Sequence, residues 1–255
     1  MLYPMNQPLV SVIMPCYNAE KYIAEAIISV IEQTYVNWEL LVVDDCSKDS
    51  SVDIIRSFCE QDKRIRYYKT EFPSGGATTP RNIAIQHAQS RFIAFLDSDD
   101  IWLPTKLEQQ LKLFSDEKTA IVYSNYEKIN QQGERHNRII IAPQQISYNG
   151  LLKENVIGCL TGIYDTKKVG KVYLKKCGHE DYVLWLSILK QGYTAKNTNT
   201  ITALYRTQKN SLSGNKLRAA KWTWNIYRKV EKLNVVASLY YFLHYCARSG
   251  LKFLK

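Results

Sequence analysis

The chain has 255 residues, of which 45% are hydrophobic, and its formal net charge at pH 7 is +10. This length and composition predict a globular domain with a substantial core and exclude a disordered chain. The positive excess lies at one end: residues 206–255 hold eleven Lys and Arg against one acid, Glu231, while residues 1–205 are neutral overall. Such a basic tail is typical of proteins that bind an anionic partner, either membrane lipid or nucleic acid.

The cysteines and the N-terminal residues exclude several classes of protein. The six cysteines form no C-x-x-C pair and have no close His partner, so we expect neither a zinc site nor a disulfide framework. The chain begins Met-Leu-Tyr-Pro without a basic segment before an apolar one, and no run of about 18 apolar residues occurs. We therefore expect a protein of the reducing cytoplasm that neither is secreted nor spans a membrane.

Strand and helix patterns alternate along the first hundred residues. Short apolar runs predict buried strands, and apolar residues at helical spacing predict helices between them. The predicted strands cover residues 9–14, 39–43, 64–69 and 92–96, and the predicted helices cover residues 19–34, 52–59 and 80–88. This alternation predicts an α/β fold with a mainly parallel, doubly wound sheet.

Three polar loops, at residues 15–18, 44–47 and 97–100, each follow a predicted strand. Ligands of doubly wound sheets bind at the carboxyl ends of the strands, so we expect these loops to form one site. A G-x-G-x-x-G motif and a G-x-x-x-x-G-K-[S/T] motif are both missing from the sequence. Their absence argues against a nicotinamide or flavin site and against a phosphate-loop NTPase.

The third loop, Asp97-Ser98-Asp99-Asp100, puts three carboxylates at the end of a buried strand. Like charges this close raise one another's pKa, and a divalent cation that carries a phosphorylated ligand would compensate them. The alternative is an ordinary polar turn or helix cap, because Asp and Ser favour both. The rest of the chain decides between these interpretations.

Six motifs in order resemble the inverting, nucleotide-sugar-dependent glycosyltransferases of family two. They are VSVIMPCYN (10–18), WELLVVDDCSKDSS (38–51), GGATTPRNIAI (75–85), RFIAFLDSDDIWLP (91–104), GHEDYVLWLSILKQGY (178–193) and YRTQKNSLS (205–213). The resemblance is greatest to the bacterial enzymes that build teichuronic acid, capsule and O-antigen. It implies the A-type glycosyltransferase fold, with a Rossmann-like, mainly parallel central sheet flanked by helices.

The resemblance also implies a reaction. The expected enzyme moves a hexose or an N-acetylhexosamine from a UDP-sugar to a saccharide acceptor, which is expected to be lipid-linked, for the synthesis of cell-surface polysaccharide. Its expected cofactor is Mn²⁺ or Mg²⁺. Its expected location is the cytoplasm, peripheral on the inner face of a bacterial cell membrane. The alternative class is a non-catalytic module that binds membrane or nucleic acid through the basic tail.

The resemblance assigns the donor residues by position. Pro15, Tyr17 and Asn18 are expected to bind the nucleotide, with Tyr17 stacking on the base. Asp45 is expected to accept a hydrogen bond from the imide of uracil. Arg81 is expected to face the diphosphate. The acids of the family's D-x-D motif correspond to Asp97, placed near the ribose or the metal, and Asp99, the expected direct metal ligand.

Asp181 falls at the catalytic-base position of the family, where it would deprotonate the acceptor hydroxyl. The alternative is that Glu180 and Asp181 only favour the N-terminus of a helix through its dipole. Glu180 and Arg206 are candidates for acceptor or diphosphate contacts. Many relatives carry a histidine two residues after this arginine, whereas Gln208 stands here and is a poor metal ligand.

These motifs divide the chain into a catalytic domain at residues 1–213 and basic amphipathic helices at residues 214–255. Within the first, residues 9–104 form the expected nucleotide-binding half and residues 105–213 the acceptor half. Residues 216–233 interleave apolar and basic side chains. This segment either lies on anionic lipid, giving peripheral membrane contact, or packs its apolar side on the catalytic domain. Nucleic acid is not an expected partner.

Overall fold

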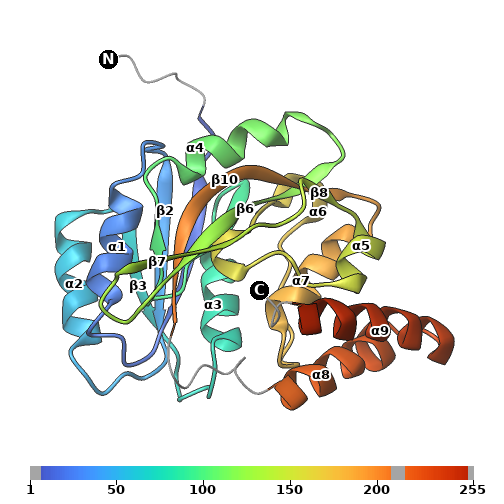
Figure 1. The fold of residues 1–255 in the computed structure, drawn as a ribbon. Helices are drawn as coiled ribbons and strands as arrows, with labels where there is room; N and C mark the ends of the chain where they lie inside the picture. Colours follow the sequence, from blue (N-terminus) through green and yellow to red (C-terminus); the bar gives the residue numbers. More distant parts are fainter. Residues whose placement is uncertain (1–6, 208–215, 252–255) are drawn as a thin grey trace.

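The structure, a computed structural model, describes residues 7–207 and 216–251. Within these ranges, ten strands form one mixed sheet that has helices on both faces (Figure 1). The strands are β1 (Val10–Cys16), β2 (Trp38–Asp44), β3 (Ile65–Lys69), β4 (Phe92–Phe95), β5 (Ile101–Trp102), β6 (Thr119–Ile129), β7 (Arg135–Ile140), β8 (Gln145–Ile146), β9 (Ile163–Asp165) and β10 (Thr194–Arg206). The α-helices are α1 (Ile23–Ile31), α2 (Ser51–Gln61), α3 (Thr78–His87), α4 (Lys106–Leu111), α5 (Tyr148–Lys153), α6 (Thr166–Val169), α7 (Glu180–Leu189), α8 (Lys216–Asn225) and α9 (Val235–Leu251).

The sheet has the strand order β3-β2-β1-β4-β9-β6-β10-β5, with β7 paired to β6 and β8 paired to β10. The first four strands in this order are parallel, as the alternation of strands and helices predicts. β9 is antiparallel to both of its neighbours, and it joins the parallel part to the parallel pair of β6 and β10. The sheet is therefore mainly parallel near the N-terminus and mixed beyond β4.

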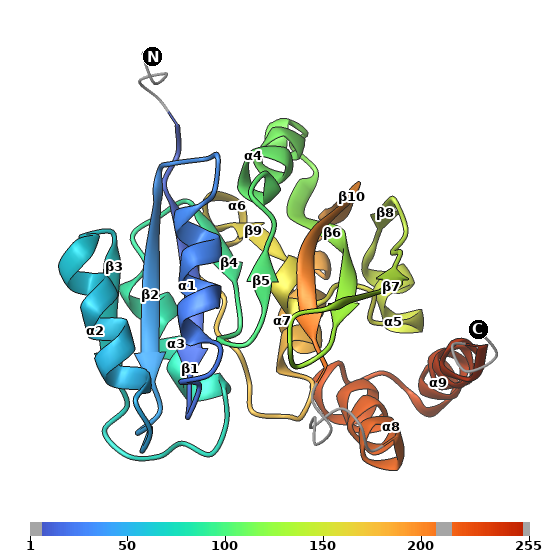
Figure 2. The ribbon, with the colours of Figure 1, turned by 60° about the vertical axis from the view of Figure 1, so that its left-hand side comes forward.

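Both faces of the central strands are buried, which explains their continuous apolar runs. In β1, Val12 and Met14 pack with α1 and α2 on one face, whereas Ile13 packs with α3 and α7 on the other. β2 alternates in the same way, with Val42 on the first face and Val43 on the second. Two hydrophobic cores consequently hold the sheet between two helical layers, as Figure 2 shows from the side.

Two predicted helix starts differ from the structure by two or more residues. α1 begins at Ile23, four residues later than predicted, because residues 19–22 form a turn after Asn18, which has a φ of 47°. The left-handed region suits asparagine better than most residues. α3 begins at Thr78, two residues before the proline that was expected to start it.

The C-terminal helices α8 and α9 lie together at one end of the molecule (Figure 2). The segment that follows α8 packs onto the catalytic domain: Ile226 and Tyr227 are fully buried, and the Tyr227 hydroxyl donates to the carbonyl of Leu152 at 2.6 Å. Ile226 and Tyr227 of the segment 216–233 are therefore turned inward, whereas Leu217 near its start is 86% exposed. None of the described helices combines the length and the hydropathy that a bilayer crossing requires.

Candidate active site

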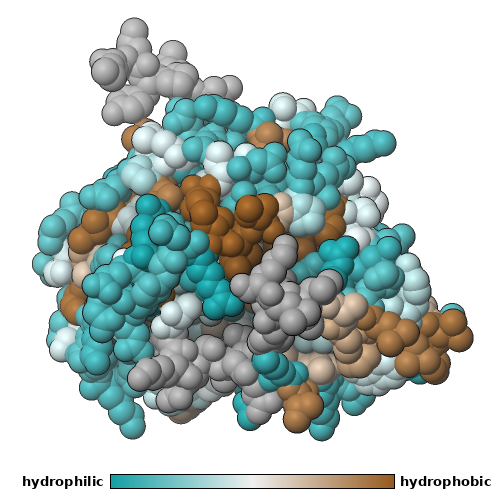
Figure 3. All heavy atoms as spheres, viewed as in Figure 1, coloured by the Kyte–Doolittle hydropathy of each residue, from teal (hydrophilic) through white to brown (hydrophobic). Residues whose placement is uncertain are grey.

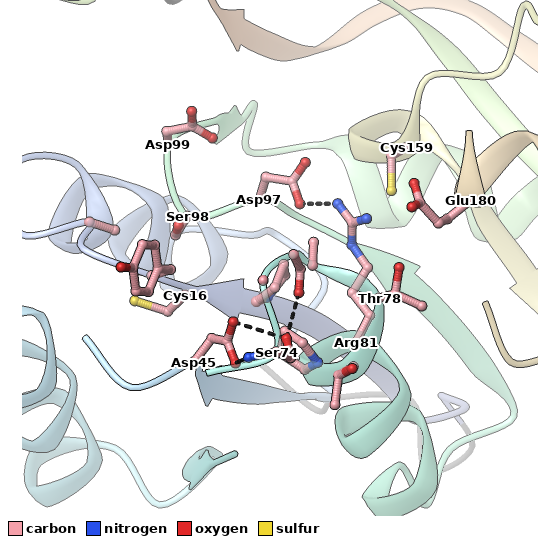
Figure 4. A pocket seen from close by; sticks show the side chains of 18 of the residues that line it. Cys16, Asp45, Ser74, Thr78, Arg81, Asp97, Ser98, Asp99, Cys159 and Glu180 are labelled. Carbon is pink, nitrogen blue, oxygen red and sulfur yellow. Dashed lines mark hydrogen bonds and ion pairs between the residues drawn. The ribbon is translucent and has the colours of Figure 1, made fainter. Parts of the chain in front are cut away.

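A cleft of about 1910 Å³ opens at the carboxyl ends of β1, β2 and β4 (Figure 4). It exceeds the roughly 300 to 1,000 Å³ that is usual for a site holding one small ligand, so it has room for more than one. Nine of the ten predicted site residues line it, and they are Pro15, Tyr17, Asn18, Asp45, Arg81, Asp97, Asp99, Glu180 and Asp181. The expectation that the three polar loops form one site is confirmed.

The loop after β1 is tied to the loop after β2. The backbone N–H of Asn18 donates to Ser47 Oγ at 2.9 Å, and its side-chain Oδ1 accepts from the backbone N–H of Lys48 at 2.8 Å. These two bonds fix the backbone beside Tyr17, a residue that is 56% exposed. The aromatic face of Tyr17 is thus available for stacking at the rim of the cleft.

Asp45 is almost fully buried at the end of β2, where hydrogen bonds hold its carboxylate. Oδ1 accepts from Thr70 Oγ1 at 2.9 Å and from the backbone N–H of Ser74 at 2.8 Å, while Oδ2 accepts from Ser74 Oγ at 2.9 Å. An ionised carboxylate has about four acceptor sites, so one site on Oδ2 remains for a ligand N–H. This geometry is compatible with the predicted contact to a uracil imide.

The turn after β4 separates its acids into different environments. Asp100 is buried, and its Oδ1 accepts from the backbone N–H of Arg206 at 2.8 Å. Burial, followed by the charges of Asp99 and Asp97, raises the pKa of Asp100 well above its ordinary value. Asp97 and Asp99 line the cleft instead, which leaves this pair to face a ligand.

The residues of this turn fit a divalent cation. Carboxylate oxygens are the ligands that Mg²⁺ and Mn²⁺ prefer, and Mg²⁺ commonly takes one or two carboxylates and completes its shell with phosphate and water. Among the residues that the structure describes, no three His, Cys, Asp or Glu side chains are arranged to hold an ion by themselves. The donor set of Asp97 and Asp99 therefore suits an ion that arrives with a diphosphate.

Arg81 projects from α3 into the space between the β4 turn and α7 (Figure 4). Its guanidinium forms an ion pair with Asp97. Burial is the largest single influence and lowers the pKa of Arg81, but the surrounding groups, with Asp97 foremost, together outweigh it and raise the pKa, so the group stays charged. Its Nε is buried and has no hydrogen-bond partner in the described part of the chain. A buried donor of this kind suits an incoming phosphate oxygen.

Asp181 lies in the first turn of α7, close enough to Arg81 for their charges to interact. Burial raises its pKa, and the positive charge of Arg81 partly opposes this shift. A carboxylate with a raised pKa is a better proton acceptor, which suits a general base. Glu180 lies beside it, and its Oε1 accepts weakly from the backbone N–H of Gly178 at 3.4 Å.

Arg206 is the predicted site residue that does not line the cleft, since its side chain is only 1% exposed. Its guanidinium donates to the carbonyls of Asp99 at 2.8 Å, Asn130 at 3.2 Å and Gln131 at 3.1 Å, and it forms an ion pair with Glu25. These contacts make Arg206 a clamp on the turn that carries Asp99. They use its guanidinium within the protein, and the diphosphate or acceptor contact expected from the sequence stays a prediction.

Several cleft residues were not indicated by the sequence, above all Trp222 of α8. Its ring lies against Gly178, which has a φ of +98°, and edge-on to the ring of His179 at 5.3 Å. A Cβ on Gly178 would lie 2.3 Å from the Trp222 ring. In the sequence, the only sign that Trp222 approaches this backbone closely is that a glycine, Gly178, stands two residues before Glu180. Cys159 and Lys176 also line the cleft without any motif that predicts them.

Residues 208–213, including Gln208, lie outside the described residues, as does the predicted boundary at residue 213. The expected division at residue 104 falls within the ten-stranded sheet, because β5 pairs with β10. The two halves therefore share one sheet, and the cleft lies between loops that both halves contribute.

Comparisons with known proteins agree with the motifs. The chain is 43% identical over 245 residues to WfgD of Escherichia coli, a UDP-Glc:α-D-GlcNAc-diphosphoundecaprenol β-1,3-glucosyltransferase, covering 94% of this chain and 93% of WfgD. It is 40% identical over 247 residues to TuaG of Bacillus subtilis (strain 168), whose name assigns it provisionally to teichuronic acid biosynthesis as a glycosyltransferase, covering 96% of this chain and 97% of TuaG.

The fold is similar to that of a crystal structure of S. aureus TarS residues 1–349 in complex with UDP-GlcNAc. The TM-score is 0.69 at 21% identity, and the match covers 86% of this chain and 66% of that one. At this identity the likeness shows the fold, and it confirms the predicted A-type fold. Residues 11–168 match the family described as Glycosyl transferase family 2. The chain therefore belongs to glycosyl transferase family 2.

Proposed function

We propose that this enzyme transfers a hexose or an N-acetylhexosamine from a UDP-sugar to a lipid-linked saccharide, with inversion at the anomeric carbon. The observation that carries the proposal is the shared cleft of Asp97, Asp99 and Asp181, with the buried cation of Arg81 beside them. Such an arrangement offers a metal–diphosphate site next to a base. A non-catalytic binding module would have no use for it.

The donor and the acceptor are inferred from relatives. WfgD is named for UDP-Glc as donor and for a sugar on diphosphoundecaprenol as acceptor, and the TarS structure contains UDP-GlcNAc. The remaining acceptor site on Asp45 Oδ2 and the exposed ring of Tyr17 support a uracil base. Because the WfgD acceptor is a lipid, we infer that this chain works on the inner face of the cell membrane and contacts it peripherally.

The chemistry follows from the positions of the charged groups. Asp181 accepts the proton of the acceptor hydroxyl, which then attacks the anomeric carbon from the side opposite to UDP. A single displacement of this kind inverts the configuration, so an α-linked D-hexose donor yields a β-glycoside. Arg81 offers its Nε–H to the diphosphate oxygens. When bound by Asp97 and Asp99, Mn²⁺ or Mg²⁺ would stabilise the charge of departing UDP.

The test is thermal unfolding of the protein with UDP, GDP or CMP, each with and without Mn²⁺. A ligand at about 100 times its dissociation constant stabilises the folded state by about 2.7 kcal/mol, which raises Tm by about 5 to 11 °C at this size. We expect this shift with UDP and Mn²⁺ only. The Asp99→Asn variant should lose it, whereas Glu117→Gln, a change of an exposed acid outside the cleft, should keep it. The absence of a shift with every nucleotide would contradict the proposal.

A further inference from the structure

The outer side of α9 is apolar. Its exposed large hydrophobic residues are 48 to 78% exposed, and they are Val235, Val236, Leu239, Tyr240 and Leu243. Helical spacing puts them within one arc of the helix, and Cys246 and Ala247 extend the same arc. The single Lys or Arg of the helix, Arg248, lies off this arc and forms an ion pair with Glu154 at 2.7 Å. We call this arc the α9 outer face.

The inner side of α9 already packs on the protein. Tyr241 and Phe242 contact the hydrophobic core. The ring centre of Phe242 lies 5.4 Å from the ring centre of Trp224 in α8. An amphipathic helix normally buries its only apolar side. α9 instead has a second apolar side, and Figure 3 shows hydrophobic residues gathered at the end of the molecule that α9 forms. A contiguous patch of this kind marks an interaction site.

Basic residues lie at the start of the α9 outer face and beside it. Lys229 and Lys232 are exposed just before the helix, and Lys153 of α5 has its Nζ 5.6 Å from the ring centre of Tyr240. On α8, the exposed basic residues are Lys216, Arg218 and Lys221.

The neighbouring acids do not offset this charge. Glu231 is buried and pairs with Lys190 at 2.9 Å, and Glu154 pairs with Arg248. The surface at the start of the apolar arc and beside Tyr240 is therefore basic. Charge complementarity favours an anionic partner that also has an apolar layer.

We propose that the α9 outer face docks on the surface of an anionic lipid bilayer, with the helix lying in the plane of the interface. The apolar arc would enter the boundary between headgroups and acyl chains, and the lysines would lie near lipid phosphates. The choice of lipid rests on the proposed lipid-linked acceptor. A second copy of the chain fits less well, because a symmetric contact would bring the two basic rims together.

Docking through α9 would also bring the cleft to the membrane. α8 contacts α9 and contributes Trp222 to the cleft near Asp181. A lipid-linked sugar could then reach the base while its diphosphate and lipid remain at the interface. The same two helices would serve both as anchor and as part of the acceptor end of the site.

The test is cosedimentation with vesicles of phosphatidylglycerol and phosphatidylcholine, without donor or acceptor. Wild type should partition to these vesicles, and Leu243→Ser should bind about tenfold more weakly, the ratio expected from removing one inserted leucine. Ile141→Ser is the matched control, because Ile141 is 78% exposed and lies outside α9. Raising the salt concentration from 0.1 to about 0.5 M should weaken wild-type binding several-fold by screening the lysines.

Three results would overturn the proposal: wild type that stays in the supernatant, equal loss of binding in both variants, or a wild-type dimer that Leu243→Ser dissociates. The UDP and Mn²⁺ thermal shift is measured on the same samples to verify folding of each variant. It also separates the two proposals. If the wild-type protein binds vesicles but no nucleotide, the proposed function is wrong and the docking surface stands. If it binds UDP but no vesicles, the docking surface is wrong and the proposed function stands.

Discussion

Replacing Arg206 with alanine should destabilise the protein and loosen the turn that carries Asp99. Arg206 donates hydrogen bonds to three backbone carbonyls, those of Asp99, Asn130 and Gln131, and its guanidinium lies 4.5 Å from the ring centre of Tyr22. The variant removes all of these contacts at once. Its backbone N–H, which donates to Asp100, is retained.

The magnitude follows from these contacts. Each of these partly buried carbonyls that loses its donor costs about 1 kcal/mol. The ion pair adds less than about 1 kcal/mol, because the Glu25 side chain is 51% exposed and solvent screens the pair. A total of about 3 kcal/mol lowers Tm by about 6 to 12 °C in a domain of this size.

The assay compares thermal unfolding of wild type, Arg206→Ala and Arg206→Lys, each titrated with UDP and Mn²⁺. Lysine keeps the charge near Glu25 but cannot reproduce the fork of donors, so it should recover only part of the loss. Both variants should need more Mn²⁺ for the UDP-dependent shift. Arg138→Ala, at an exposed position of β7, is the control and should behave as wild type. An Arg206→Ala protein with the Tm and Mn²⁺ dependence of wild type would refute this role.

Three further predictions concern buried or closely packed groups. Lys106 is fully buried, and burial lowers its pKa to about 7. Above pH 7 the folded state therefore binds fewer protons than the unfolded state, so the free energy of unfolding should rise by about 1.4 kcal/mol per pH unit between pH 7 and 9. Lys106→Met should remove this rise in thermal melts. The raised pKa of Asp181 should move the acidic limb of kcat/KM above the range of an ordinary aspartate, and a limb within or below that range would contradict it. Gly178→Ala should displace Trp222 and raise the acceptor KM, as Trp222→Ala does, while UDP binding stays unchanged; equal acceptor KM values in wild type and both variants would exclude this role.

The positions of the donor-side residues could be predicted from the sequence because each depends on a short segment of the chain. An apolar run that ends in Asp97 and Asp99 predicts both a buried strand and acids at its carboxyl end, and the parallel pairing of β1 with β2 and β4 brings the loops together. The same reasoning placed Tyr17 and Asp45 correctly at the cleft. Their roles in binding remain predictions.

The hydrogen bonds by which Arg206 holds the turn with Asp99 could not be predicted in the same way. Arg206 and the turn that it holds are about a hundred residues apart, and only the pairing of β5 with β10 brings them together. A sequence pattern shows that an arginine is present, but not that backbone carbonyls surround it.

The tail shows a second limit. The apolar residues of 216–233 indicate an amphipathic helix without indicating what covers its apolar side, and the structure turns Ile226 and Tyr227 inward. The exposed apolar arc lies on α9 instead, where both sides of the helix are apolar. Periodicity alone cannot tell which of two such sides faces solvent.

The most direct test of the account is sugar transfer by wild type and by Asp181→Asn, with UDP release measured with and without a lipid-diphosphate-linked saccharide acceptor. Wild type should release UDP only when a matching UDP-sugar, the acceptor and Mn²⁺ or Mg²⁺ are all present. Asp181→Asn should lower kcat about 10² to 10⁴-fold and keep the UDP-dependent thermal shift, whereas Asp53→Asn, an exposed acid of α2, should transfer normally. Transfer by Asp181→Asn at the wild-type rate would contradict the account.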